Sequence, residues 1–204
     1  MPEPIDWLPD GTPFSPRFSD RYHSENGGLD QAHQVFLHGC GLPAAWAGSA
    51  QWRILETGFG FGLNFLVTWA AWRTDAQRPR LLHFISTEAW PVSAADLLRA
   101  ASAHPELAPL AQELHDQFWG LLPGVHRLTF DAGRVMLTLC IGDAQTVLRQ
   151  QEWTGLRQSA FARAIRQSKT AYAPIQARRK PATACRDYTA RHDCLIHKWN
   201  PHNG

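Results

Sequence analysis

A short apolar segment followed by three glycines spaced two apart constrains the fold of this chain more than any other feature. The segment reads Ile54-Leu-Glu-Thr-Gly-Phe-Gly-Phe-Gly-Leu-Asn-Phe-Leu66, with Gly58, Gly60 and Gly62 between an expected strand and an expected apolar helix. Glycine lacks a Cβ, so such a turn can adopt positive φ and let a ligand lie against the backbone. The helix after it offers free N–H groups and the positive end of its dipole. The pattern predicts a ligand-binding turn, although a tight turn that needs glycine only for its geometry stays open.

The residues around the glycines narrow the class of ligand. A dinucleotide fingerprint has the spacing G-x-G-x-x-G and a P-loop ends in Gly-Lys-Ser/Thr, whereas this chain has G-x-G-x-G with no lysine after it. Glu56 precedes the glycines and Asn64 follows them. A carboxylate in this place repels phosphate but can pair with the ammonium group of an amino-acid-like ligand. We therefore expect S-adenosylmethionine as the cofactor rather than a dinucleotide.

Length and composition bound the class of protein. The 204 residues suffice for one domain with a substantial core, with or without a tail. We find no signal-peptide pattern and no apolar run long enough to span a membrane. The four cysteines, Cys40, Cys140, Cys185 and Cys194, show no tight pairing pattern, which favours reduced thiols. We expect a cytoplasmic protein without membrane association.

Charge is divided unevenly along the chain. Residues 1–154 carry ten Lys/Arg and sixteen Asp/Glu, a net charge of −6, and residues 155–204 carry ten Lys/Arg and two Asp, a net charge of +8. Such a change is typical of a separate module or of a basic tail that binds nucleic acid.

Strand and helix patterns alternate along the first 150 residues. Residues 1–28 interleave aromatic side chains with Pro, Gly, Ser and Asp, which predicts an ordered extended arm rather than disorder. We expect strands at 53–55, 81–87, 125–131 and 134–141, the last two forming a hairpin, and helices at 29–37, 64–73, 93–103, 105–118 and 145–150. This alternation predicts an open α/β sheet, in which ligands bind beyond the carboxyl ends of the strands.

Three of the expected strand ends carry polar residues. The first is the segment from Glu56 to Gly62. The second is Glu88, which could accept both hydroxyls of a ribose or could be a helix cap or a surface carboxylate. The third is Asp143 in Gly142-Asp143-Ala144, which could contact an adenine amino group, cap the next helix, or do both. Together these residues fit an adenosine-containing ligand with a cationic amino-acid end.

At these positions the chain resembles the methyltransferase part of the bifunctional tRNA 5-methylaminomethyl-2-thiouridine biosynthesis proteins and its stand-alone relatives. The resemblance covers roughly residues 5–154. Besides the glycine turn, the matching motifs include Asp10-Gly-Thr-Pro-Phe-Ser15, Phe18-Ser-Asp-Arg-Tyr22, Leu82-His-Phe-Ile-Ser86, His126-Arg-Leu128 and Gly142-Asp-Ala144. Two departures are mild: Phe61 stands where the family usually has Thr, and Cys40 stands where Asn is common.

The resemblance implies a Rossmann-like, S-adenosylmethionine-dependent methyltransferase. Its implied reaction is methylation of the exocyclic amine of 5-aminomethyl-2-thiouridine at the tRNA wobble position, with tRNA as partner and no metal. The resemblance places the cofactor against Glu56, Gly58, Gly60, Gly62, Asn64, Glu88 and Asp143. Asp20 and Tyr22, in the N-terminal arm, are candidates for the substrate side, with packing of the arm as the alternative.

The resemblance ends abruptly after Thr154. The family continues with a strand that ends in a motif of the form Leu-Asp-Gly-Phe-Ala/Ser-Pro, whose Asp lies against the substrate amine. Here Leu156 begins the sequence Leu-Arg-Gln-Ser-Ala-Phe-Ala-Arg, and no such motif follows. The family's flavin-dependent oxidase domain is also absent from this chain. We therefore expect a sheet truncated after the Gly142-Asp143 strand end, and no catalytic residue can be assigned.

Residues 155–204 have three competing interpretations. They could be an RNA-binding extension whose basic residues contact phosphates. They could be a metal site made of Cys185, His192, Cys194, His197 and His202, although this spacing matches no standard zinc pattern. The favoured hypothesis is a reading-frame shift near codon 155, because the composition changes where the resemblance stops.

The expected domains are an arm and helix (1–50), a cofactor-binding core (51–154) and a non-matching tail (155–204). The alternative function is an inactive remnant that binds cofactor or tRNA.

Overall fold

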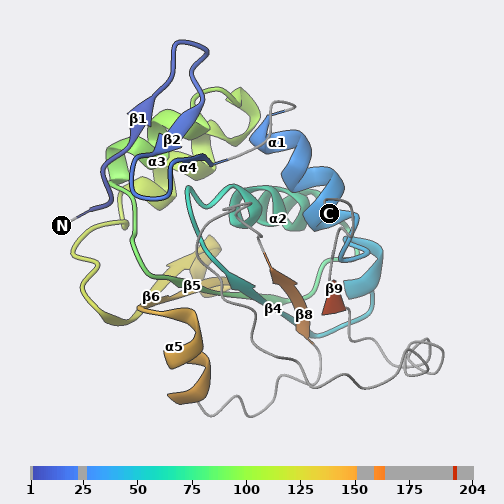
Figure 1. The fold of residues 1–204 in the computed structure, drawn as a ribbon. Helices are drawn as coiled ribbons and strands as arrows, with labels where there is room; N and C mark the ends of the chain where they lie inside the picture. The colour runs from blue at the N-terminus through green and yellow to red at the C-terminus, as the bar shows by residue number, and fades with distance from the viewer. Residues whose placement is uncertain (1, 23–26, 151–158, 164–194, 197–204) are drawn as a thin grey trace, which may run out of the picture.

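A mixed β-sheet forms the centre of the molecule. The computed structural model describes residues 2–22, 27–150, 159–163 and 195–196 (Figure 1). The strand order of the main sheet is β6-β7-β5-β4-β8-β9. Its longer strands are β4 (Gln51–Thr57), β5 (Leu81–Glu88), β6 (Gly124–Phe130) and β7 (Val135–Ile141). Strands β4, β5 and β7 are parallel and β6 is antiparallel to β7, so the predicted Rossmann-like α/β fold and the hairpin are confirmed.

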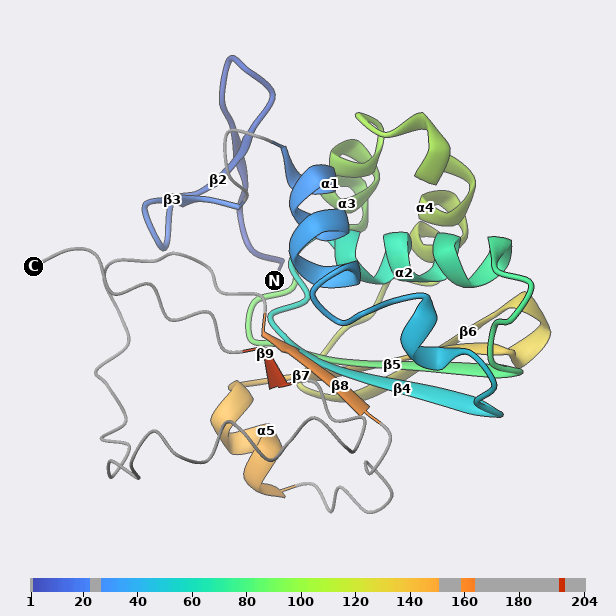
Figure 2. The ribbon, with the colours of Figure 1, turned by 90° about the vertical axis from the view of Figure 1, so that its right-hand side faces the viewer.

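Helices lie on both faces of this sheet. The helices α1, α2, α3 and α4 lie on one face, and α5 lies on the other (Figures 1 and 2). Their bounds are α1 Gly28–Gln31, continued by the π-helical segment η1 Ala32–Leu37, α2 Leu63–Thr74, α3 Ala94–Ala101, α4 Ala108–His115 and α5 Ala144–Gln150. The short 3-10 segments are η2 Ala44–Trp46, η3 Pro105–Leu107 and η4 Asp131–Gly133. No described helix is long and apolar enough to cross a membrane.

Local sequence explains where α3 and α4 begin and end. Ser93 caps α3, because its Oγ accepts a hydrogen bond from the Asp96 N–H at 3.0 Å and donates one to the Asp96 carboxylate at 2.6 Å. The helix predicted over 105–118 is shorter than expected, since it starts as η3 and ends at His115. The chain then turns so that the buried Phe118 ring stacks on Phe59, with ring centroids 5.9 Å apart.

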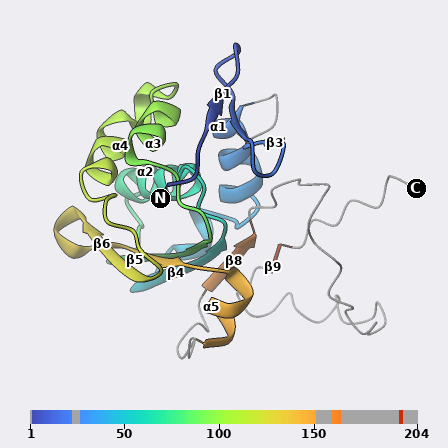
Figure 3. The same ribbon diagram turned by 60° about the vertical axis from the view of Figure 1, so that its left-hand side comes forward.

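The N-terminal arm is a small sheet of its own. Strands β1 (Asp6–Trp7), β2 (Pro13–Ser15) and β3 (Asp20–Arg21) pair antiparallel on the helical side of the main sheet (Figure 3). The buried Glu3 carboxylate accepts a hydrogen bond from Arg17 Nε at 2.8 Å. The Trp7 indole N–H donates to Asp96 of α3 at 3.0 Å. These contacts confirm the ordered arm predicted from its aromatic content.

Two short strands extend the sheet beyond β4, where the sequence predicted none after Thr154. β8 (Ser159–Arg163) runs parallel to β4, from the pair Arg53↔Ser159 to the pair Thr57↔Arg163. β9 (Leu195–Ile196) pairs with β8 at two positions. An open strand edge is satisfied by any backbone N–H and C=O groups, whatever side chains they carry. The pattern of apolar residues therefore gave no signal for these strands.

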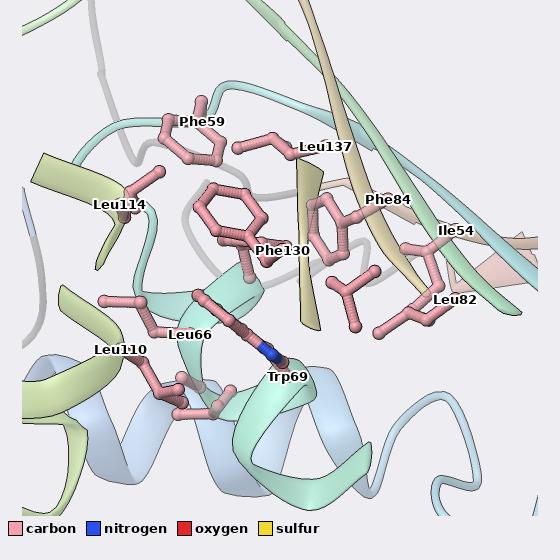
Figure 4. Close-up of a cluster of buried hydrophobic side chains, with 14 of the residues drawn as sticks. Ile54, Phe59, Leu66, Trp69, Leu82, Phe84, Leu110, Leu114, Phe130 and Leu137 are labelled. Carbon is pink, nitrogen blue, oxygen red and sulfur yellow. The ribbon is translucent and has the colours of Figure 1, made fainter. Parts of the chain in front are cut away.

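An aromatic cluster joins α2 to the sheet. Trp69, Phe84 and Phe130 project into the space between them (Figure 4). Phe65, which is fully buried, packs at 5.4 Å from the Phe84 ring and 5.7 Å from the Phe130 ring. Asp131 accepts hydrogen bonds from the Trp69 indole and from Arg73, so the β6–β7 turn is tied to the same helix. This cluster fixes the distance between α2 and the sheet. It thereby fixes the position of the glycine turn, which leads into α2.

Phe65→Ala should destabilise the protein by about 3–5 kcal/mol, because the large cavity left in the cluster cannot collapse. Phe65→Leu keeps most of the volume and should cost less than about 1.5 kcal/mol. Urea unfolding followed by tryptophan fluorescence measures both values. A loss below about 1 kcal/mol for Phe65→Ala would contradict the central role given to this ring.

Candidate functional site

The glycine turn between β4 and α2 has positive φ at each of its three glycines. The φ values are 85° at Gly58, 56° at Gly60 and 73° at Gly62. A Cβ on Gly62 would lie 2.7 Å from a Phe59 ring carbon, so packing as well as conformation requires glycine there. A Cβ on Gly60 would meet only Tyr22, at 3.9 Å. Positive φ and close packing therefore explain why residue 62 is a glycine. At Gly60 the packing would admit a side chain, so space is left beside the backbone.

Backbone hydrogen bonds attach this turn to the end of β5. The Gly58 and Phe59 N–H groups donate to the Thr87 carbonyl at 2.8 and 3.2 Å. The Gly60 N–H donates to Glu88 Oε2 at 2.9 Å, and the Trp90 N–H donates to Glu88 Oε1 at 3.0 Å. Glu88 is 5% exposed. The predicted first and second strand ends therefore meet, and the Glu88 carboxylate lies against the glycine turn.

Glu56 is the most buried acid of the site. Its side chain is 1% exposed, and it accepts hydrogen bonds from Asn64 Nδ2 at 2.8 Å and from Ser86 Oγ at 2.7 Å. Burial, and to a smaller extent the nearby charge of Glu88, raises the pKa of Glu56 to about 8, against the opposing hydrogen bonds from Asn64 and Ser86. A second acid, Glu88, therefore lies near this buried carboxyl group. Such an environment favours a cation as ligand.

Ser86 is a member of the site that sequence reasoning missed. Side chains alternate between the two faces of a strand, so Leu82, Phe84, Ser86 and Glu88 share the face of β5 that packs on the helices. A single serine among apolar residues of that face was the available signal. The parallel pairing Glu56↔Ser86 places its hydroxyl beside the Glu56 carboxyl.

The N-terminus of α2 opens at the same end of the sheet. Its N-cap is Gly62 in the left-handed conformation, and no side chain caps it. Asn64, in the first turn, reaches back to Glu56 rather than to the helix backbone. The first N–H groups of a helix carry partial positive charge, which favours an anionic group. The site thus offers an acidic and a positively polarised surface side by side.

Asp143 occupies the third predicted strand end and caps α5. Its Oδ1 accepts hydrogen bonds from the Thr146 N–H and the Thr146 hydroxyl, both at 3.0 Å, and these bonds lower the pKa of the exposed Asp143 carboxyl. The Gly142 N–H donates to the Glu88 carbonyl at 2.9 Å, so this strand end adjoins the second one. Capping is the contact that the structure contains. A contact with adenine stays a prediction.

The N-terminal arm covers the glycine turn from the side. The Tyr22 ring meets the buried Phe61 edge-on, with centroids 4.5 Å apart, and Trp7 lies 6.0 Å from the same ring. Packing of the arm, the alternative weighed for Tyr22, is therefore observed. Asp20 Oδ1 accepts a hydrogen bond from the Arg21 N–H at 2.8 Å. Its Oδ2 is buried and has no hydrogen-bond partner among the described residues.

The described residues form no metal centre. No group of three His, Cys, Asp or Glu side chains in that part of the chain could hold an ion. Cys40 and Cys140 are buried free thiols. The zinc-site alternative, with Cys185, Cys194 and three histidines, falls outside the described residues.

Known proteins are similar in sequence to this chain over about three quarters of its length. No family model matches the chain. The tRNA 5-methylaminomethyl-2-thiouridine biosynthesis bifunctional protein of a Polaromonas species is 73% identical over 153 residues, which is 75% of this chain and 24% of that protein. The protein of the same name from Thiobacillus denitrificans is 54% identical over 143 residues, 70% of this chain and 23% of that protein. The matching part of the chain belongs to this family. The chain spans about a quarter of the length of these curated relatives.

A solved structure supports the fold. The crystal structure of MNMC2 from Aquifex aeolicus superposes with a TM-score of 0.53, over 77% of this chain and 47% of that one. The sequence identity is 20%, so the similarity bears on the fold alone. The α/β architecture expected from the family resemblance is thereby confirmed.

Glu56→Gln should flatten the pH dependence of stability. The folded-state pKa of about 8 lies above the ordinary 4.5, so the folded protein holds a proton that the unfolded chain releases between these values. Stability of the unliganded protein should therefore fall as pH rises through this window, by up to about 1.4 kcal/mol per pH unit, and the variant should lose this slope.

Urea unfolding of both proteins from about pH 5 to pH 8 measures the effect. Glu106→Gln, at an exposed acid, is the matched control and should keep the slope of the original chain. Parallel curves for the original chain and Glu56→Gln would contradict the raised pKa.

Proposed function

We propose that this chain binds S-adenosylmethionine and serves the methylation of the exocyclic amine of 5-aminomethyl-2-thiouridine in tRNA, in the cytoplasm. The observation that carries the proposal is Glu56, a buried acid whose pKa is raised by burial and by the nearby charge of a second acid, Glu88. A cationic ammonium group beside it would remove most of the cost of its ionisation. A phosphate ligand would increase that cost.

Each part of the site then has a role in holding the cofactor. Glu56 accepts the ammonium group, and the N-terminal N–H groups of α2 face the carboxylate of the same amino-acid end. Glu88 presents its carboxylate to the ribose hydroxyls, and the left-handed Gly58 and Gly60 let the ligand approach the backbone. Asp143 lies on the adenine side. In terms of domains, residues 1–50 supply the covering arm and residues 51–154 supply the cofactor-binding core.

The chemistry of the reaction depends mainly on positioning. The bound cofactor supplies an electrophilic methyl group. In-line transfer to an amine requires the two reacting groups to be held in contact and the amine to be unprotonated. A carboxylate oxygen can orient the amine or take its proton. Asp20 has a buried oxygen without a hydrogen-bond partner in the described chain and lies two residues from Tyr22, which packs beside the glycine turn. We assign Asp20 and Tyr22 to the substrate side.

One observation favours the alternative of a binding remnant that does no chemistry. The strand that pairs with β4 on its other edge ends at Arg163, in register with Thr57. Residues 155–186 contain no Asp or Glu, so this strand end lacks the carboxylate that the family resemblance implies. The sequence similarity stops near the same place, which supports a frame shift near codon 155.

Two ligands and two variants test the cofactor site. Glu56→Gln should weaken binding of S-adenosylmethionine by about ten-fold or more, because it removes the partner of the ammonium group, and should leave adenosine binding nearly unchanged. Glu88→Gln should weaken the binding of both ligands, because both contain the ribose. Isothermal titration calorimetry measures the affinities of the original chain and of both variants for S-adenosylmethionine and for adenosine.

Glu106→Gln, at an exposed acid of η3, is the control and should bind both ligands like the original chain. Failure of the original chain to bind S-adenosylmethionine would overturn the proposed function. Equal effects of Glu56→Gln on the two ligands would overturn only the role given to Glu56.

Catalysis is tested by exchanging the tail. A chimera that keeps residues 1–154 and continues with the corresponding sequence of the Polaromonas relative should transfer methyl groups from labelled S-adenosylmethionine to tRNA that carries 5-aminomethyl-2-thiouridine. The chain with its own tail should be slower by at least about 100-fold, a size typical of losing a group that positions or deprotonates the nucleophile. Equal rates would show that the tail does not impair the enzyme.

A further inference from the structure

The loop between α4 and β6 presents two large apolar side chains to solvent. Trp119 is 77% exposed and Leu122 is 71% exposed, the highest values among the large hydrophobic residues that the structure describes. Trp90, which follows Glu88, is 43% exposed, and its ring is flanked by Phe18 and Arg17. We call Trp119 and Leu122 the apolar loop tip. Tryptophan is enriched at binding interfaces, so an exposed Trp in an ordered loop marks a candidate contact site.

The loop is held by its own contacts. On one side of Trp119, Phe118 is 3% exposed and stacks on Phe59 of the glycine turn. On the other side, the Leu122 carbonyl lies 2.6 Å from His126 Nε2. The Gln117 amide also donates to the Thr129 carbonyl at 3.2 Å. The backbone is therefore fixed on both sides of the tip, and the exposure of Trp119 is a property of an ordered loop.

The apolar loop tip lies at the cofactor edge of the sheet. Gly124, the first residue of β6, pairs with Ile141, and Ile141 pairs with Glu88. The α4–β6 loop thus enters the sheet at the carboxyl ends of the parallel strands, where the proposed cofactor site is. Figure 3 shows it reaching β6 from α4 on that side. A nucleotide that brings its reactive group to this edge approaches the loop that carries Trp119, whose neighbour Phe118 stacks on Phe59 of the glycine turn.

Size and charge identify the kind of partner. A stable protein interface buries roughly 800 Å² on each partner, whereas two side chains of this size supply at most roughly 400 Å². One nucleic-acid base covers an indole ring almost completely. The exposed acid nearest in sequence, Asp116, disfavours phosphate contacts here, and residues 1–154 carry a net charge of −6. Stacking does not depend on charge, so it is compatible with an acidic surface.

We propose that Trp119 stacks on an unpaired base of the tRNA substrate next to the nucleotide that is modified, and that Leu122 packs against the same base. This inference rests on the proposed function, since it names the contact that brings the RNA to the cofactor site. The face of Trp119 is the recognition element, and it tolerates any base because every base has a π-face.

Substitution of the loop tip tests this contact. Trp119→Ala should weaken binding of a synthetic anticodon stem–loop RNA by about ten-fold, the effect of losing one base stack, and Trp119→Phe should keep most of the affinity. Fluorescence anisotropy of the labelled RNA, with the full chain at two salt concentrations, measures this. The salt dependence should be the same for the original chain and for Trp119→Ala, because no phosphate contact is removed.

Two controls separate this inference from the proposed function. Val35→Ala, which truncates another exposed apolar side chain, should leave RNA affinity unchanged. Binding of S-adenosylmethionine by Trp119→Ala should equal that of the original chain. If the original chain binds the RNA through Trp119 but does not bind S-adenosylmethionine, the proposed function fails and the stacking contact stands. Unchanged RNA affinity in Trp119→Ala, or no binding of the RNA by the original chain, overturns the inference. A changed oligomeric state with unchanged RNA affinity overturns it as well and assigns the loop tip to a protein partner.

Discussion

The buried carboxyl group of Glu56 is the constraint on which the rest of the site depends. An acid at the carboxyl end of a central strand is costly to bury unless its oxygens are hydrogen-bonded. Asn64 and Ser86 supply these bonds from α2 and β5. Asn64 can reach Glu56 only because α2 begins directly after a tight turn, and the turn is tight because its glycines have positive φ. The glycines, the helix start and the strand pairing are therefore consequences of one local requirement.

Glu88 adds a second acid to the same edge and makes the site selective by charge. Both of its oxygens accept backbone N–H groups, which orient the carboxylate against the glycine turn. Burial disfavours the ionised form of Glu56, so a cation beside this carboxyl group would lower the cost of its ionisation. The two acids distinguish the site from phosphate-binding glycine loops, in which no carboxylate precedes the turn.

Sequence reasoning predicted the parts of the structure that depend on local pattern. The strand before the glycines, the helix after them and the β6–β7 hairpin were confirmed because each is encoded by a pattern of neighbouring residues. Contacts over longer separations were missed. Ser86 meets Glu56 across 30 positions of the chain, which requires the register of β4 on β5. β8 was missed because an open strand edge can pair with any backbone N–H and C=O groups, whatever the sequence. The exposure of Trp119 could not be predicted, because a count of nine tryptophans does not tell which of them the core leaves outside.

The net negative charge of residues 1–154 restricts the kinds of contact that this part of the chain can make with a polyanion such as RNA. Long-range attraction between its first 154 residues and RNA is unfavourable at their net charge of −6. Recognition by these residues must then come from short-range contacts, and stacking and shape are the ones that charge does not oppose. Both exposed tryptophans of the described chain lie in segments that adjoin the proposed cofactor edge, Trp90 two residues after Glu88 and Trp119 in the loop that leads to β6. The same edge therefore combines acids suited to a cationic cofactor with aromatic rings suited to bases. The proposed methylation of tRNA needs both, because the methyl group and its acceptor must meet at one place.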